Sequence, residues 1–135
     1  MKHRIHVLFV VNGLGIGGAE KQVVSLLNHL DIEHFSLSLA YLNDKKHLLS
    51  ELDTARLDGG AFCGHVSTKV ELRAVRLLSE HIRAREIDVL VCTNTYSLLY
   101  GWLARRRGSR RTKLVVVFHT TEPGTFKGWL QMLFY

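Results

Sequence analysis

The hydrophobic positions of this chain follow two periods, and they predict a strand, a turn and a helix at its start. Residues 5–11 form a near-continuous apolar run, as in a parallel strand that is covered on both faces. Four glycines, at 13, 15, 17 and 18, then allow a tight turn and close approach of a ligand. After them, apolar residues recur on one helical face: Ala19, Val23, Leu26, Leu27 and Leu30.

The same alternation continues to the end of the chain. We expect strands over 35–42, 61–66, 87–92 and 114–118, with the strand over 35–42 near a sheet edge. We expect helices over 48–57, 68–85, 96–107 and from 126 onward. Thr68 and Glu71 have the spacing of a capping box, with Glu71 as the third helical residue. The buried face of that helix is expected to carry Leu72, Val75, Leu78 and Ile82.

Strands that alternate with helices predict right-handed crossovers and an α/β, Rossmann-like doubly wound parallel sheet with helices on both faces. Ligands of such sheets bind beyond the carboxyl ends of the strands. Three loops should therefore meet at one site, over residues 12–18, 93–95 and 119–125. The glycine loop would direct bare N–H groups and a helix N-terminus at an anion such as phosphate.

The glycine loop fits G-x-G-x-x-G over 13–18, which is the spacing of dinucleotide-binding folds. That function also needs an acid after the second strand for the ribose, and Asp44 is the nearest one. No lysine followed by Ser or Thr stands in P-loop spacing, which excludes a Walker-type nucleotide-binding site. The loop can also be interpreted as a purely structural glycine turn that binds no ligand.

Composition places the chain among ordinary globular domains and narrows its surroundings. Its 135 residues suit one domain, and no apolar run approaches the roughly 18 residues of a membrane span. Cys63 and Cys92 are expected to be reduced core thiols, since Cys63 and His65 lack two further metal ligands. No signal peptide is recognised, so the cytoplasm is the expected compartment.

The formal net charge of +6 is concentrated in residues 105–113, which hold five arginines and a lysine. Such a run is most simply a solvated loop. Peripheral contact with the anionic inner face of the membrane is the second interpretation, because each basic residue there contributes about 1 kcal/mol. Trp129 beside Lys127 would suit the same contact. No aromatic residue lies among the arginines, so nucleic acid is not expected as a partner.

Three segments together resemble the N-terminal domain of family 4 glycosyltransferases, which have the GT-B fold. Residues 17–20, Gly-Gly-Ala-Glu, follow a short apolar strand and open a helix with Leu-Leu-Asn-His-Leu at 26–30. Residues 87–94, Ile-Asp-Val-Leu-Val-Cys-Thr-Asn, resemble the family's fourth strand, although Thr93 and Asn94 stand where many members have a histidine. His119 and Thr120 resemble the family's histidine after the fifth strand.

The resemblance implies a transferase that moves a sugar from a nucleotide-sugar to an acceptor, with retention of anomeric configuration. Residues 1–135 would form the acceptor-side domain, truncated at its C-terminal end, and the nucleotide-sugar domain would be absent or supplied by a partner chain. No cofactor and no metal are expected, and no Asp-x-Asp motif occurs. The implied site residues are His119 near the reacting sugar, Gly15, Gly17 and Gly18 at the donor diphosphate, and Asn12, Thr93, Asn94, Thr120 and Glu122 toward the acceptor.

Two other functions remain open on the sequence. One is an NAD(P)-binding domain that uses the glycine loop and Asp44. The other is the non-catalytic half of a split glycosyltransferase, since the chain stops on the apolar helical pattern Leu-Phe-Tyr at 133–135. In either glycosyltransferase case the isolated chain is expected to be inactive.

Overall fold

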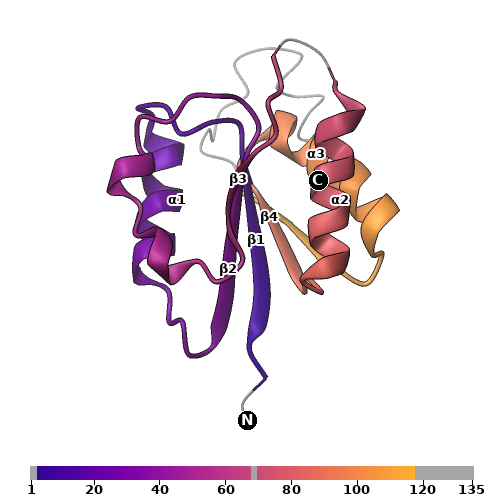
Figure 1. The fold of residues 1–135 in the computed structure, drawn as a ribbon, viewed down its shortest axis with the longest axis horizontal. Helices are drawn as coiled ribbons and strands as arrows, with labels where there is room; N and C mark the ends of the chain where they lie inside the picture. The colour runs from indigo at the N-terminus through magenta and orange to yellow at the C-terminus, as the bar shows by residue number, and fades with distance from the viewer. Residues whose placement is uncertain (1–2, 68–69, 118–135) are drawn as a thin grey trace.

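The computed structural model describes residues 3–67 and 70–117, and within them one parallel sheet lies between two layers of helix (Figure 1). The predicted α/β doubly wound fold is confirmed. The strands are β1 (Ile5–Val11), β2 (Phe35–Tyr41), β3 (Gly60–Cys63), β4 (Val89–Cys92) and β5 (Lys113–Val116). The helices are α1 (Gly18–His29), α2 (Leu72–Ala84) and α3 (Thr95–Gly108).

The strand order β3-β2-β1-β4-β5 places β1 at the centre of the sheet. β1 pairs with β2 on one side and with β4 on the other, so that Val10 lies opposite both Ala40 and Cys92. A central strand is buried on both faces, which explains the near-continuous apolar run of β1. β2 lies next to the edge strand β3, so the expectation that it lies near an edge is confirmed. Its small polar residues are nevertheless buried and face a helix, as Ser38 Oγ shows by hydrogen-bonding His81 Nε2 of α2.

Two separate cores hold the layers together. On one face, α1 packs on β1 and β2 through residues such as Leu27, Leu37 and Leu39. On the other face, α2 and α3 pack on β1 and β4 through residues such as Leu78 and Tyr100. Figure 1 shows α1 on one side of the sheet and α2 with α3 on the opposite side. The two-faced covering predicted from the alternating pattern is therefore confirmed.

The helix expected over 48–57 is wrong. The chain forms two short 3₁₀ turns there, η1 (Leu49–Glu51) and η2 (Thr54–Arg56). Asp53 interrupts the pattern, because its carboxylate accepts a hydrogen bond from Ala55 N and caps the second turn. Leu52 and Leu57 are nevertheless buried beside α1, so the apolar spacing reflects packing rather than helix.

The start of α2 differs from the expected capping box. Glu71 is the N-cap rather than the third helical residue, and Thr68 lies outside the described residues. The Glu71 N–H donates to the Tyr100 hydroxyl at 2.8 Å, which ties the start of α2 to α3. Leu72 is 69% exposed, so the buried face begins only at Ala74.

The amino-terminal edge of the sheet is organised by Asp58. Its carboxylate accepts hydrogen bonds from Arg4 (2.6 Å), Ser36 Oγ (2.8 Å) and Leu37 N (3.1 Å). Burial raises the pKa of Asp58, but the hydrogen bonds from Ser36 and Arg4 outweigh it, and the net pKa is lowered. This cluster links β1, β2 and the turn before β3 at the edge away from the expected site.

Candidate functional site

In the part of the sheet that the structure describes, a topological switch point lies between β1 and β4. These strands are neighbours, but the chain leaves β1 for α1 on one face and leaves β4 for α3 on the other. The loops after β1 and β4 therefore diverge and leave a crevice at the carboxyl ends of the strands, where ligands of open α/β sheets bind. The predicted loops 12–18 and 93–95 flank this crevice.

The register of the sheet brings Asn12, Thr93 and Asn94 to the same level. Val10 pairs with Cys92, and Thr93 N donates to Val10 O at 3.3 Å, so Asn12 and Asn94 each lie two residues beyond this pair. Thr93 is buried. Asn94 is the N-cap of α3, and its side-chain oxygen accepts from Ser97 N at 3.1 Å. Asn94 thus caps the N-terminus of α3, the helix that turns away from the crevice.

Asn12 carries the most informative atom of the crevice. Among the described residues, its Oδ1 is a buried side-chain oxygen with no hydrogen-bond partner. Buried polar atoms are bonded in the large majority of cases, so an orphan of this kind calls for a water or a ligand. The oxygen and nitrogen of a carboxamide are assigned from the surrounding hydrogen bonds, so the missing group is a donor or, with the amide turned, an acceptor. A sugar hydroxyl can be either.

The glycine loop is anchored rather than free. Leu14 is fully buried; its N–H donates to Lys45 O at 2.9 Å, and its carbonyl accepts from Leu48 N at 2.9 Å. Gly17 N donates to Gly15 O at 2.9 Å. Two amides that the sequence left available to a phosphate are therefore used within the protein. The loop after β1 is joined instead to the loop after β2.

The four loop glycines do not serve to turn the chain, because none of them has a positive φ. Close approach of a neighbouring side chain is seen at two of them. A Cβ on Gly13 would lie 2.0 Å from Asn43 Oδ1, and one on Gly17 would lie 2.2 Å from Glu20 Oε2. A Cβ on Gly18 would meet nothing within 4 Å. Gly13 is thus required by the protein's own packing, whereas the contact at Gly17 is with the end of the flexible Glu20 side chain and Gly18 faces open space at the start of α1.

The N-terminus of α1 has a carboxylate of its own. The N-cap residue, Gly17, provides no side-chain cap, and Glu20 in the first turn lies back over it. A negative group at the positive end of a helix is favourable. An anionic ligand at Gly18 would therefore compete with the Glu20 carboxylate for the positive end of the α1 helix dipole.

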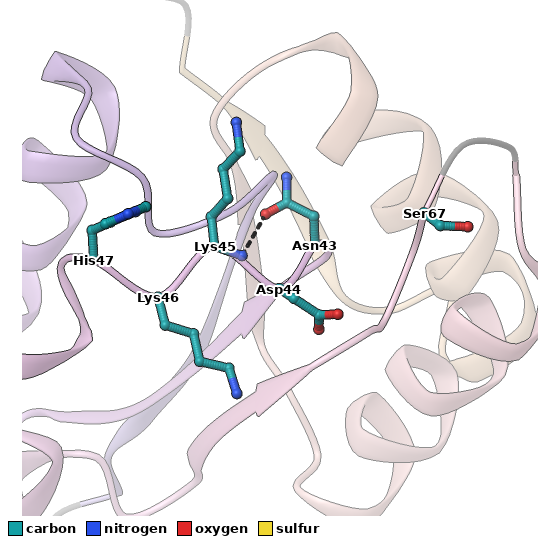
Figure 2. A pocket seen from close by; sticks show the side chains of 6 residues that line it. All are labelled: Asn43, Asp44, Lys45, Lys46, His47 and Ser67. Carbon is teal, nitrogen blue, oxygen red and sulfur yellow. Dashed lines mark hydrogen bonds between the residues drawn. The ribbon is translucent and has the colours of Figure 1, made fainter.

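An open pocket of about 780 Å³ lies beside the glycine loop, at the carboxyl end of β2 (Figure 2). This pocket was not predicted from the sequence. Its lining is polar, and Lys45 and Lys46 extend to opposite sides of the loop. Lys45 N donates to Asn43 Oδ1 at 3.0 Å, which holds the same carboxamide that packs against Gly13. The only signal in the sequence was a short basic run, Lys45-Lys46-His47, in the loop after a strand. The lining residues are Asn43, Asp44, Lys45, Lys46, His47 and Ser67.

Asp44 does not face the glycine loop, as an acid that holds a ribose would. Its Oδ1 lies 3.1 Å from Cys63 Sγ and 2.9 Å from His65 Nδ1. The hydrogen bond from Cys63, followed by that from His65, lowers the pKa of Asp44. This engagement disfavours the dinucleotide-binding interpretation.

The two cysteines differ. Cys92 is a buried core thiol as expected, and burial raises its pKa to about 12. Cys63 is only partly buried and contacts Asp44, so the expectation of a core thiol is wrong for it. Burial, followed by the hydrogen bond to Asp44, raises the pKa of the Cys63 thiol.

The basic run lies at the opposite edge of the sheet from the crevice. It begins in the last turn of α3 and ends at the first residue of β5, and both lie at the amino-terminal edge. Arg105 is partly structural, because its guanidinium donates to Thr112 O and to Arg110 O. Arg106 lies 5.0 Å over the Trp102 ring. The run therefore cannot hold an anion bound at the glycine loop.

Three predicted site residues, His119, Thr120 and Glu122, lie outside the described residues, as does the helix expected from 126 onward. The predicted residues that the structure brings together are Asn12, Gly15, Gly17, Gly18, Thr93 and Asn94. They come from two loops that share one edge of the sheet.

A model of the protein family described as Glycosyltransferase Family 4 matches residues 16–135. No curated protein matches the sequence. Three solved structures are similar in fold, and the chain spans between 20% and 38% of their lengths.

A glycosyltransferase from Rickettsia africae is similar over 95% of this chain and 34% of its own, at 18% identity and a TM-score of 0.68. MurG of Acinetobacter baumannii is similar over 95% and 38%, at 14% identity and a TM-score of 0.67. A mutant O-GlcNAc transferase from Thermobaculum terrenum is similar over 84% and 20%, at 17% identity and a TM-score of 0.61.

Proposed function

We propose that this chain, which belongs to glycosyltransferase family 4, supplies the acceptor-side half of a transferase that uses a nucleotide-sugar. The sugar would move from the diphosphate of the donor to a hydroxyl of an acceptor. The second half, which would hold most of the nucleotide, would come from a following domain or a partner chain. The small share of the structural neighbours that this chain covers supports the need for such a half.

The observation that carries the proposal is the orphan carboxamide oxygen of Asn12 at the switch point. A sugar or acceptor hydroxyl in the crevice would satisfy it. Thr93 and Asn94 border the same crevice from β4 and would approach the acceptor. Thr120 and Glu122 are also proposed to contact the acceptor.

The donor diphosphate is proposed to lie at Gly18, where the start of α1 is open. Helix N-termini and backbone amides stabilise a leaving phosphate without a metal. Gly15 and Gly17 belong to the same loop and shape it. His119 is proposed to hydrogen-bond the reacting sugar. Transfer with retention remains part of the proposal.

The test is an NMR titration of the isotope-labelled chain with UDP, GDP, ADP, NAD and NADP. Because the loop is half of a site, we expect weak binding, with amide shifts over residues 12–19 for every diphosphate. Tight saturable binding of NAD or NADP that is lost in Gly15→Val would overturn the proposal in favour of a dinucleotide-binding domain. The absence of shifts at 12–19 with all five compounds would also overturn it.

Peripheral contact with an anionic membrane is a second proposal, and α3 carries its support. Leu99 and Trp102 are 38% and 41% exposed on this helix, and Arg106 stacks over the indole. Aromatic and basic side chains on one helix face suit the membrane–water interface. No helix in the described part of the chain has both the length and the apolarity to cross a membrane.

Co-sedimentation with vesicles tests this contact. Binding to phosphatidylglycerol vesicles that falls with added salt and with Trp102→Ala is expected. Equal recovery with neutral phosphatidylcholine vesicles would contradict it.

A further inference from the structure

Asp44, Cys63 and His65 form a cluster of three different metal-ligating side chains beside the pocket. One ligand atom from each residue lies within 4.8 Å of the other two. The Asp44 Oδ1 is the centre, at 3.1 Å from Cys63 Sγ and 2.9 Å from His65 Nδ1. The three ligand atoms therefore lie close enough together for one ion to contact all of them.

Hydrogen bonds now join the ligand atoms that a metal ion would bind. The Cys63 thiol donates to the Asp44 carboxylate, and the His65 ring approaches the same oxygen. A cation that displaced the thiol proton to solvent would meet a thiolate, an imidazole nitrogen and a carboxylate. The His65 backbone N–H also donates to Cys63 Sγ at 3.3 Å, and such a hydrogen bond to a ligand atom would stabilise the thiolate.

The sheet holds these residues in place. Cys63 ends β3 and pairs with Tyr41, the last residue of β2, three positions before Asp44. Beyond the strand, Gly64 N donates to Tyr41 O at 2.8 Å and Val66 N donates to Leu42 O at 2.7 Å. Between these two anchors His65 adopts a φ of +53°, a left-handed conformation that is uncommon for a residue with a side chain. Such a conformation persists only where the surrounding structure imposes it.

The chemical types of the three ligands indicate which metal ion they would bind. A thiolate with an imidazole and a carboxylate suits Zn²⁺, whereas Mg²⁺ and Ca²⁺ prefer oxygen ligands alone. Three protein ligands leave one tetrahedral position open. The side chains of Asp44 and His65 are 71% and 65% exposed, so this position faces solvent. The nearby ammonium of Lys46, which acts on both Asp44 and Cys63, limits the affinity.

We propose that Asp44, Cys63 and His65 bind a zinc ion with one coordination position open to the pocket at the end of β2. This site is separate from the crevice between β1 and β4 and does not depend on the transferase proposal. It differs from the expectation that Cys63 and His65 lack further ligands, because Asp44 joins them from another strand end.

The test uses Co²⁺ as a spectroscopic probe on the tag-free chain. We expect one equivalent to produce a thiolate-to-cobalt charge-transfer band and intense visible bands of a tetrahedral ion, both reversed by Zn²⁺. Cys63→Ser should abolish the charge-transfer band and weaken zinc binding by at least about 100-fold, since even the groups that hydrogen-bond a metal's ligands are worth roughly 10- to 100-fold in affinity. His65→Ala and Asp44→Asn should each weaken binding by more than about tenfold.

Matched controls are the other thiol and a neighbouring histidine. Cys92→Ala and His47→Ala should keep the band. A band that survives in Cys63→Ser, or no saturable band in the wild-type chain, overturns the proposal. Alkylation provides a second measurement that needs no core variant. Zn²⁺ should protect Cys63 from iodoacetamide in the wild-type chain and not in His65→Ala, and equal labelling with and without Zn²⁺ would refute the site.

Discussion

Gly18 is the position where a substitution should have the most different effects on stability and on ligand binding. It is the first residue of α1, its φ is not positive, and a Cβ there would meet no atom within 4 Å. Gly18→Ala should therefore fit the folded protein without strain. Because alanine loses less backbone entropy than glycine on folding, we expect stabilisation by about 0.4–1 kcal/mol.

The same substitution should obstruct a ligand that needs the bare backbone of the loop. We expect the amide shifts caused by inorganic pyrophosphate over residues 12–19 to require at least about tenfold more ligand, a loss of roughly 1.4 kcal/mol. Urea denaturation followed by circular dichroism measures the first effect, and the NMR titration measures the second.

Gly13→Ala is the matched control, because its Cβ would lie 2.0 Å from Asn43 Oδ1. Overpacking of this kind costs about 1–3 kcal/mol, so this variant should lose stability. If Gly18→Ala binds pyrophosphate as well as the wild-type chain, Gly18 has no role in ligand approach. If Gly18→Ala is destabilised as much as Gly13→Ala, the description of the helix start is wrong.

Three further substitutions test the packing and the charges of the fold. Tyr100→Phe leaves the Glu71 N–H without its acceptor and should cost about 1–3 kcal/mol in urea denaturation; an unchanged midpoint would contradict the cap. Gly101→Ala would place a Cβ 2.5 Å from Cys92 Sγ, and a loss of about 1–3 kcal/mol in the same assay is expected. Asp58 has a lowered pKa in the folded state, so its contribution is present above the unfolded pKa near 3.8 and is lost as the pH falls through the folded value. Asp58→Asn should therefore lower the free energy of unfolding more at pH 7 than at pH 2, and an equal loss at both pH values would refute the assignment.

The first half of the site was predictable because its signals are local. The apolar run of β1 and the glycines before α1 gave the bounds of both elements within a residue. Alternating strands and helices then placed Asn12 and Thr93 at one edge by topology alone.

The rest depended on contacts between distant parts of the chain. The alternation in β2 suited a strand near the sheet edge, but it did not show that Ser36 and Ser38 are buried, with Ser38 bonded to His81 of α2. Asp44 meets His65, 21 residues further on, only because β2 pairs with β3 in one register. The glycines looked like turn formers, whereas the close approach of Asn43 to Gly13 sets the requirement there. No periodicity in the sequence reports such pairings.

The measurement that tests the central claim most directly is the release of nucleoside diphosphate from UDP-, GDP- and ADP-sugars. It should compare this chain alone with the chain expressed together with the coding sequence that adjoins it in its genome. The account predicts release only from the combined protein, and loss of that release when Gly18→Val is introduced. Release by this chain alone, or full release with Gly18→Val, would contradict the proposal that the glycine loop forms half of a nucleotide-sugar site.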